Sequence, residues 1–251
     1  MAREAGQVLN ETDIYREWAP PSGWEEVVAC CWEQRVGTGR VQRVLPDGHA
    51  DLIIYDTGQI EVTGLHDQVA LPALATGAHL RGIRVRPAAV AAAFGTPASL
   101  LRNRTLPADT VLGSKRASQL IDPDGMDTWI RSIKPDPRTC AAVKLLAGRS
   151  VDEVAVTLDV SGRQLRRLVS ADVGLPPKLY QQVLRLQHFV RAIDAGVQLA
   201  GAAAIAGYAD QPHMTRSIQR FCGIAPARLA RERRAAPIAG QPSSPLPDSI
   251  P

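Results

Sequence analysis

The spacing of apolar residues changes character near the middle of the chain. Up to about residue 130, short apolar runs alternate with turn residues, as at Pro46-Asp47-Gly48, where proline presets φ and glycine accepts a positive φ. Runs of this kind predict strands. The expected strands span residues 24–36, 41–45, 52–55, 59–63 and 78–86. Two prolines then suit the starts of short helices at 87–94 and 97–101, so this half is predicted to be a β-rich partial barrel with a few short helices.

Beyond residue 138 the apolar spacing is helical throughout. The clearest helix is 177–194, whose apolar residues step by four, three, four and three positions and therefore share one face. Those residues are Leu179, Val183, Leu186, Val190 and Ile193. Seven helices are predicted in all, at residues 138–147, 151–158, 161–172, 177–194, 199–206, 210–221 and 226–233.

These patterns predict an α+β multidomain protein. A β-rich domain is expected over residues 1–130, a linker over 131–137 and an all-α domain over 138–234. Residues 1–23 are polar and are interpreted as a loose leader with one short helix. The Pro- and Ser-rich tail, 235–251, is expected to be disordered because it has too few apolar residues to form a core.

Charge divides at the same place as the predicted structure. Residues 1–130 hold 12 Lys and Arg against 16 Asp and Glu, a net charge of −4, whereas residues 131–251 hold 17 against 9, a net charge of +8. A concentrated positive field attracts polyanions. Charge alone leaves two interpretations open, a nucleic-acid-binding surface and a basic surface that serves solubility.

The helical half contains an internal repeat at an offset of 49 residues. Residues 161–174 align with residues 210–223. Both segments begin with a good helix N-cap, Ser161 or Asp210, carry apolar residues at the same two inward positions and end in a glycine that suits a left-handed turn. A short apolar helix and a tight turn precede each segment, so each is predicted to form a helix-turn-helix.

The second helix of such a unit is the one that enters DNA. The major groove of B-DNA is about 12 Å wide and admits one α-helix, and there arginine can pair with guanine and glutamine with adenine. The outward-facing residues of the two second helices are therefore the candidate DNA contacts. They are Ser161, Arg163, Gln164, Arg166, Arg167, Gln211, His213, Thr215 and Arg216.

Two alternatives stay open for these helices. They could be generic helical hairpins of an interaction domain, and some of the arginines could bond phosphate or brace the fold rather than read bases. Two copies, each with a basic second helix and joined by one long helix, favour DNA.

Residues 150–233 resemble the DNA-binding domain of the AraC/XylS transcriptional regulators. The resemblance is carried by the stretches 207–216 (GYADQPHMTR) and 221–229 (FCGIAPARL), and it covers about two-fifths of the chain. The departures are Ile218, where the family usually has Phe, and Met214, where an aromatic residue or Leu is frequent. The resemblance implies two helix-turn-helix units on a linker helix, both recognition helices entering successive major grooves, and a sequence-specific transcriptional regulator.

The acidic half resembles a domain that often precedes this module. The stretches 45–53 (LPDGHADLI) and 82–87 (GIRVRP) carry that resemblance. By analogy, this half would sense a ligand or mediate dimerisation. The implied partners are promoter or operator DNA, a small-molecule effector and RNA polymerase, and both a monomer and a homodimer remain open.

Other chemistry has weaker support in the sequence. Asp47, His49 and Asp51 fall within five residues, with His66 and His79 elsewhere, but no second cluster has metal-ligand spacing, so no metal or cofactor is expected. The four cysteines are interpreted as small buried hydrophobes, a redox-sensing role being the alternative. They are Cys30, Cys31, Cys140 and Cys222.

The protein is not expected to be an enzyme, because nucleotide-binding and hydrolase motifs are absent from the sequence. Two competing classes are a DNA-repair enzyme with a reactive cysteine and a nucleoid protein that binds DNA without sequence choice. The charged N-terminus does not resemble a signal peptide, and no window approaches ~20 apolar residues, so a cytoplasmic location is expected.

Overall fold

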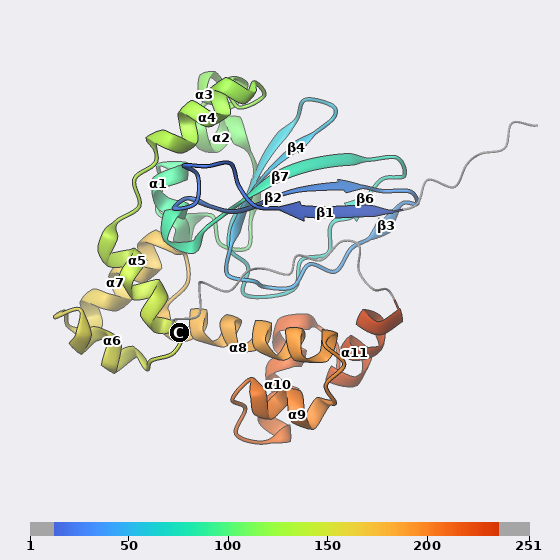
Figure 1. Ribbon diagram of the computed structural model, residues 1–251, viewed down its shortest axis with the longest axis vertical. Helices are drawn as coiled ribbons and strands as arrows, with labels where there is room; N and C mark the ends of the chain where they lie inside the picture. Colours follow the sequence, from blue (N-terminus) through green and yellow to red (C-terminus); the bar gives the residue numbers. More distant parts are fainter. Residues whose placement is uncertain (1–12, 236–251) are drawn as a thin grey trace, which may run out of the picture.

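The computed structural model describes residues 13–235, which form an antiparallel sheet followed by a set of helices (Figure 1). Six strands lie side by side in the order β1-β2-β7-β4-β5-β8, and β3 pairs with β6 in a separate two-stranded sheet. The strands are β1 (Ile14–Trp18), β2 (Val28–Arg35), β3 (Arg40–Val41), β4 (Ala50–Tyr55), β5 (Ile60–Thr63), β6 (Ala73–Leu74), β7 (His79–Val85) and β8 (Thr105–Pro107). A β-rich half followed by a helical half is the architecture predicted.

The two faces of the six-stranded sheet pack against different partners, because successive side chains of a strand point to opposite faces. Leu52, Val62 and Val85 are fully buried and face the main core, which the helices cover. Trp32 and Leu80 face the other way and belong to a smaller apolar cluster. The sheet is therefore buried on one face and lines a separate space on the other.

Short helices follow the sheet in chain order. They are η1 (Pro87–Ala89), α1 (Val90–Phe94), η2 (Ala98–Leu100), α2 (Ala108–Leu112), α3 (Ser114–Gln119) and α4 (Pro123–Ser132). The aromatic rings of Phe94 and Trp129 lie 6.3 Å apart and pin α4 against α1. Only residues 133–136 separate α4 from the next helix. Asp136 is the N-cap of that helix, and its side chain accepts hydrogen bonds from the first helical turn.

The leader prediction for residues 1–23 is wrong for residues 14–18, which form strand β1 rather than a loose segment. Its residues alternate between the two faces and pair along β2, with Arg16 opposite Glu33. The sequence also missed β6, β8, α2 and α3. The predicted strand at 41–45 is reduced to β3 and a single bridge at Val44. The rest of the leader and the tail from residue 236 lie outside the described residues.

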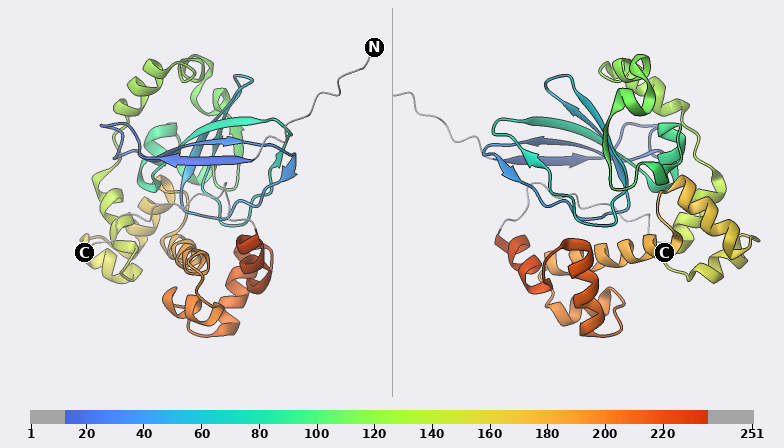
Figure 2. Two further views of the ribbon diagram at one scale, coloured as in Figure 1. Left: turned by 45° about the vertical axis from the view of Figure 1, so that its right-hand side comes forward. Right: turned by 180° about the vertical axis from the view of Figure 1, so that it is seen from behind.

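The C-terminal helices match the predicted segments to within two residues at either end. They are α5 (Pro137–Leu146), α6 (Val151–Thr157), α7 (Gly162–Asp172), α8 (Pro177–Asp194), α9 (Leu199–Ile205), α10 (Gln211–Cys222) and α11 (Pro226–Ala235). Figures 1 and 2 show α8 running beneath the sheet, with α5–α7 at one end and α9–α11 at the other. No helix within residues 13–235 is long and apolar enough to cross a membrane.

One continuous hydrophobic core joins the sheet to the helices. It includes Leu52 and Phe94 from the first half together with Leu165, Leu186 and Ile218 from the second. The two halves are therefore packed on each other rather than connected only through the chain.

Candidate functional site

The first helix-turn-helix consists of α6 and α7, and both helices begin with a capping box. Ser150 and Glu153 cap α6 reciprocally, and Ser161 and Gln164 do the same for α7. Each box satisfies two backbone N–H groups that the helix leaves without a partner. The turn between the helices contains Asp159 with φ +51°, a left-handed conformation that Asp tolerates better than most residues.

The exposed face of α7 is strongly basic. Leu165 and Val169 are fully buried and hold the helix on the core. The candidate DNA contacts on this helix, in contrast, are all exposed. They are Ser161, Arg163, Gln164, Arg166 and Arg167. Ser161 and Gln164 also have a structural role, because the Gln164 side-chain oxygen lies 2.8 Å from both the Ser161 backbone nitrogen and the Ser161 hydroxyl.

The second unit, α9 and α10, has the same order of helices and a turn that is one residue longer. Helix α9 begins 48 residues after α6 and α10 begins 49 residues after α7. Gly207, with φ +73°, follows α9 at the same distance as Asp159 follows α6. Asp210 caps α10 by accepting a hydrogen bond from the His213 N–H. Met214 is buried in the position that Leu165 occupies in the first unit. The predicted repeat is therefore present in three dimensions.

The candidate contacts on α10 are less uniformly exposed. Gln211 and Arg216 are exposed, whereas Thr215 and His213 are half-buried. The His213 ring packs edge-on against Tyr208 with centroids 5.4 Å apart. His213 therefore stabilises the turn as well as facing the surface.

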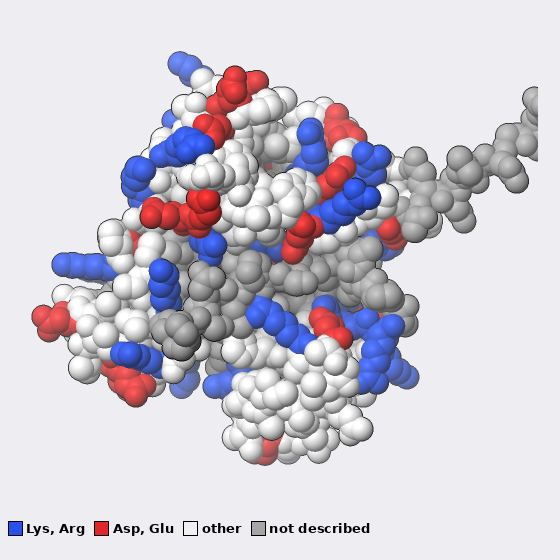
Figure 3. Space-filling model, viewed as in Figure 1, with Lys and Arg blue, Asp and Glu red and all other residues white. Residues whose placement is uncertain are grey.

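Charge on the surface follows the helices. On the face in Figure 3, acidic and basic side chains are interspersed over the sheet, and basic side chains gather beside α11. The DNA contacts predicted from the sequence do not include the arginines of this helix. They are Arg228, Arg231, Arg233 and Arg234.

The sheet-containing half contacts the C-terminal ends of both second helices, α7 and α10. Gly174, just after α7, lies so close to η2 that a Cβ there would be 2.9 Å from the Ala98 carbonyl oxygen. At the corresponding end of α10, Arg43 donates a hydrogen bond of 2.8 Å to the Cys222 carbonyl and pairs with Glu232 at 3.3 Å. Carbonyl groups at a helix C-terminus lack partners within the helix, so a cation is favourable there.

The linker helix α8 is held by the same half. Gln187 donates a 2.5 Å hydrogen bond to the Pro46 carbonyl, and the Tyr180 ring packs against Gly48. Gly48 has φ +83°, and a Cβ there would lie 3.1 Å from that ring. The turn at residues 46–49 therefore seats on the helix that joins the two units.

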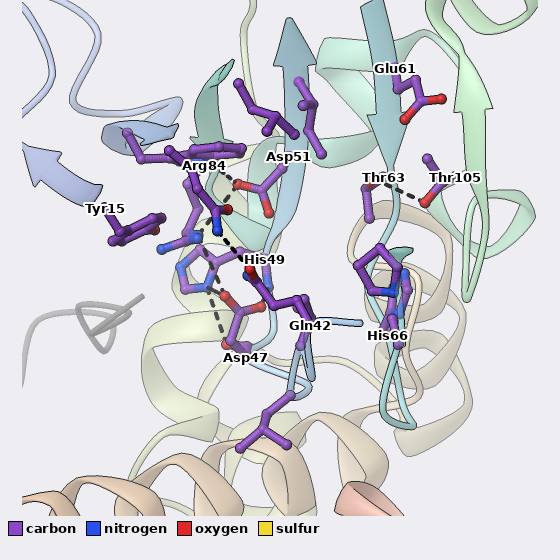
Figure 4. Close-up of a pocket in the computed structure, with 18 of the residues that line it drawn as sticks. Tyr15, Gln42, Asp47, His49, Asp51, Glu61, Thr63, His66, Arg84 and Thr105 are labelled. Atoms are coloured by element: carbon purple, nitrogen blue, oxygen red, sulfur yellow. Dashed lines mark hydrogen bonds and ion pairs between the residues drawn. The ribbon is translucent and has the colours of Figure 1, made fainter. Parts of the chain in front are cut away.

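A cavity of about 420 Å³ lies between the sheet and the helices (Figure 4). Its volume is in the range of small-molecule sites. Strands β2, β4, β5 and β7 provide part of its wall, and the segments 42–49 and 64–74 provide a similar share. Gln187 and Val190 of α8 also line it. The cluster that the sequence offered as a weak metal candidate lies in the wall of this cavity; it consists of Asp47, His49, Asp51 and His66. The cavity itself was not predicted, because its other lining residues are as far apart as Tyr15 and Arg233.

A buried arginine dominates the polar wall of the cavity. Arg84 is 3% exposed, and its Nη1 donates a 2.8 Å hydrogen bond to Glu17. Its Nε lies 3.5 Å from carboxylate oxygens of both Asp47 and Asp51. Burial opposes the charge on Arg84, but the carboxylates of Asp51 and Asp47 hold its pKa well above the usual value. Burial raises the pKa of Asp51, which Arg84 partly offsets.

The metal alternative gains no support from the geometry. Within residues 13–235 no group of three or more His, Cys, Asp or Glu side chains is arranged to hold a metal ion. His79 lies instead between Glu33 and Asp56, at 2.6 and 2.8 Å.

The cysteines are buried or half-buried free thiols. Burial raises the pKa of Cys30 and of Cys222 to about 12 and that of Cys31 to about 11. A raised pKa suppresses the thiolate that nucleophilic chemistry needs, which argues against a reactive cysteine at these positions.

Comparison with known proteins gives separate matches for the sheet-containing half and the helical half. Residues 154–232 match the family model "Helix-turn-helix domain", and residues 16–107 match "Domain of unknown function (DUF6597)". The HTH-type transcriptional regulator GbdR of Pseudomonas aeruginosa is 30% identical over 103 residues, in two strains. The match covers 40% of this chain and 27% of the relative, so the chain spans about a quarter of the length of these relatives.

Two crystal structures of ToxT from Vibrio cholerae overlap more of the chain at lower similarity. One has a TM-score of 0.45 at 10% identity, covering 86% of this chain and 97% of that one. The other has a TM-score of 0.41 at 9% identity, covering 80% and 96%. Both overlaps are too distant to bear on function. The family matches therefore identify a helix-turn-helix domain over residues 154–232 and a domain of unknown function over residues 16–107.

Proposed function

We propose that the chain is a sequence-specific DNA-binding transcriptional regulator, in which α7 and α10 enter successive major grooves. The observation that carries the proposal is the repeat itself: two capped second helices with exposed polar faces at the two ends of α8. The 18 residues of α8 rise about 27 Å at 1.5 Å per residue. That length is comparable to the ~34 Å between successive turns of a DNA groove.

We assign different roles to the nine candidate contacts. Arg163, Arg166 and Arg167 on α7 and Gln211 and Arg216 on α10 are exposed and have the chemistry to meet base edges or phosphates. The others lie beside them at the N-terminal ends of the two helices and complete the interface. They are Ser161, Gln164, His213 and Thr215.

For the first half we propose a regulatory role through a small ligand. The cavity supports ligand sensing, and the contacts of Gln187 with Pro46 and of Arg43 with Cys222 provide a route to α8 and α10. The proposed units are the regulatory domain at residues 1–130, the linker at 131–137 and the DNA-binding domain at 138–234. RNA polymerase and a second copy of the chain are further partners that the regulatory role would allow.

The experiment that tests this function is a selection of DNA sites from a random pool. The dissociation constant is then measured for the selected duplex and for a scrambled duplex of equal length at one fixed salt concentration. A regulator is expected to prefer the selected duplex by about 10³-fold or more. A ratio near one would overturn the proposal and favour a nucleoid protein.

A further inference from the structure

Most of the surface of the cavity between the sheet and α8 is apolar. The burial of apolar surface is favourable without any partner of matching charge or hydrogen-bonding capacity. An occupant of this cavity is therefore expected to be largely apolar itself. The side chains that would contact its apolar part include Val44, Leu45, Ile53, Leu74, Leu80 and Val190.

Most polar side chains of the wall already form hydrogen bonds within the protein. Trp32 donates a 2.9 Å hydrogen bond to Asp51, and Glu61 accepts hydrogen bonds of 2.8 Å from Tyr55 and from Gln59. A ligand with many polar groups would have to replace these bonds, so few polar groups are expected in the occupant. Two further bonded pairs of the wall are Gln34 with Gln42 and Thr63 with Thr105.

The buried charges of the wall are paired with one another. Arg84 donates a 2.8 Å hydrogen bond to Glu17 and forms ion pairs at 3.5 Å with Asp47 and Asp51. An anion in the cavity would lie near these carboxylates and a cation near the guanidinium, and either ion would lose its hydration on entering. An uncharged occupant avoids both effects.

Two buried side-chain nitrogens of this wall, Nε of Arg84 and Nε2 of His66, lack a hydrogen-bond partner among residues 13–235. Nε of Arg84 can only donate. Burial lowers the pKa of His66, so its ring is mainly neutral at pH 7 and its Nε2 can take either role. At 3.5 Å, the carboxylate oxygens of Asp47 and Asp51 pair with the charge of Arg84 but lie beyond the usual length of a hydrogen bond. The group that would complete the wall is therefore an acceptor for Arg84.

We propose that this cavity binds an uncharged, largely apolar molecule with one neutral oxygen, such as a carbonyl oxygen, that accepts a hydrogen bond from Nε of Arg84. A hydrogen bond from a charged donor is stronger than one from a neutral donor, which favours Arg84 over His66 as the partner of that oxygen. Figure 4 shows the two side chains apart, Arg84 beside Asp51 and His66 toward Thr63, so they are separate points of contact. The inference rests on the ligand-sensing role proposed above and names the chemical class of that ligand.

The occupant of the cavity contacts the linker helix. Gln187 and Val190 of α8 line the cavity, and Gln187 also donates its hydrogen bond to the Pro46 carbonyl. Because α8 joins the two helix-turn-helix units, an occupant that packs on it acts on both of them. A change in the affinity for DNA is the expected consequence of binding.

The test uses the full chain and three probes of matched shape, the ketone 4-phenylbutan-2-one, the anion 3-phenylpropanoate and the protonated form of 4-phenylbutan-2-amine. Isothermal titration calorimetry at neutral pH measures the three dissociation constants. The ketone is expected to bind at least about tenfold more tightly than either ion, because only the ions lose the hydration of a charge. A smaller preference, or no binding of the ketone at millimolar concentration, would contradict the proposal.

Infrared absorption reports the hydrogen bond itself. A hydrogen bond to a carbonyl oxygen lowers the stretching frequency of that carbonyl, and the difference between ketone with and without a carbon-13 carbonyl separates its band from those of the protein. The bound ketone is expected to absorb at a lower frequency than the same ketone in hexane. Absorption at the hexane frequency would show that no donor reaches the oxygen, and the contact with Arg84 would be wrong.

Two variants identify the donor. Arg84→Lys keeps a positive charge beside the three carboxylates but removes Nε, so the ketone band is expected to move toward the hexane frequency and the affinity to fall about fivefold or more. His66→Phe removes the other unpartnered nitrogen and should leave the band in place. A band that moves in His66→Phe would assign the contact to His66 and contradict the proposal. Near-UV circular dichroism verifies folding, and if Arg84→Lys does not fold, the band in His66→Phe decides between the two donors.

A bulky substitution tests whether the ketone occupies this cavity. Ile53 lines the cavity from β4, so Ile53→Trp fills part of the space, and ketone binding is expected to fall at least about tenfold. Leu100→Trp, on the exposed surface of η2, is the matched control and should leave the affinity unchanged. Equal affinities of these two variants would place the ketone elsewhere on the chain.

DNA binding is measured on the same samples. If the ketone fails to bind but the selected duplex is still preferred, only this inference falls. If the ketone binds but the chain does not discriminate between duplexes, the ligand site stands and the proposed regulator falls.

Discussion

The two helix-turn-helix units have the same arrangement of helices, but different interactions stabilise it in each unit. In the first unit, both helices begin with capping boxes, and the exposed face of α7 carries Arg163, Arg166 and Arg167. In the second, α9 has no side-chain cap and α10 has a single cap from Asp210. The second unit relies instead on aromatic packing.

That aromatic packing centres on one residue of the second turn. Tyr208 contacts Phe189 of α8, with ring centroids 6.2 Å apart, as well as His213. The difference teaches that one geometry can be held by local hydrogen bonds or by tertiary contacts. The first unit is therefore expected to be the more self-sufficient, and the second the more dependent on α8 and the sheet-containing half.

The largest expected effect is on the free energy of unfolding, and it concerns the glycines that follow α7 and α10. Gly174→Ala combines a positive φ of +93° with a Cβ 2.9 Å from the Ala98 carbonyl, and is expected to lower the free energy of unfolding by about 3 kcal/mol. Gly223→Ala meets only ordinary contact, 3.4 Å from a Val69 methyl group, and is expected to lower it by about 1–2 kcal/mol. Urea unfolding measures both.

The order of these two values is the informative result. Gly196→Ala serves as the control, because it has a positive φ of +84° but no atom within 4 Å of the added Cβ. If Gly223→Ala were the more damaging of the pair, the close contact at Ala98 would not be the decisive difference.

The next effect concerns DNA rather than stability. Arg163→Ala and Gln211→Ala are each expected to lose about 1–3 kcal/mol of discrimination at one or two base pairs. Arg163→Ala is expected to be the larger, because α7 presents the more basic face. Fluorescence anisotropy on single-base variants of the selected duplex measures the loss.

Arg138→Ala is the control for those binding measurements, since Arg138 is exposed in the basic half but lies on α5. If both recognition-helix variants discriminate as well as the parent chain, the assignment of base-reading residues is wrong.

Removing the caps gives a smaller effect. Ser161→Ala and Asp210→Ala each free an N–H group of the first helical turn and are expected to lower the free energy of unfolding by about 1 kcal/mol. Ser161→Ala also breaks the capping box with Gln164, so it should exceed Asp210→Ala. Thermal unfolding at equal protein concentration compares the two, and a reversed order would argue against a more locally stabilised first unit.

The smallest expected effect is a pH dependence confined to the first unit. Hydrogen bonds from Ser150 hold the pKa of Glu153 below its usual range, so the stabilisation is present above that range and lost as the pH falls through the lowered value. Helix α9 has no acidic residue in its first turn and should not respond.

Amide hydrogen exchange, corrected for intrinsic rates, at acidic and neutral pH measures fraying at the start of each helix. Glu153→Gln keeps an acceptor for the Ser150 N–H while removing the titrating group, so α6 should lose its pH dependence in this variant. Equal acid sensitivity of α6 and α9 would show that Glu153 is not its source.

The helical half could be predicted closely because its signals are local. Helix α8 spans residues 177–194 as predicted, since its apolar spacing and initial proline lie within one segment. The capping residues Ser161 and Asp210 likewise act within three residues of themselves. Which of the outward residues meet DNA stays a prediction.

The sheet and the cavity depended on distant residues and were less visible in the sequence. Strand β1 was missed because charged residues interrupt it and its pairing with β2 supplies the order. Arg84 looked like an ordinary strand residue, and only the fold brings Glu17 to it from 67 positions away. Strand β8 was missed because it ends in Pro107, and proline is rare within strands except at the edge of a sheet.

The contacts at Ala98 and Arg43 limit how far this DNA-binding segment can be transplanted. A helix-turn-helix pair fused to an unrelated partner would lose the surface on which Gly174 rests and the cation that satisfies the Cys222 carbonyl. The continuous core means that apolar side chains now shared with the sheet would meet water. Evolution can therefore exchange regulatory partners on this scaffold only by rebuilding both anchor points, so the two halves are expected to have diversified together.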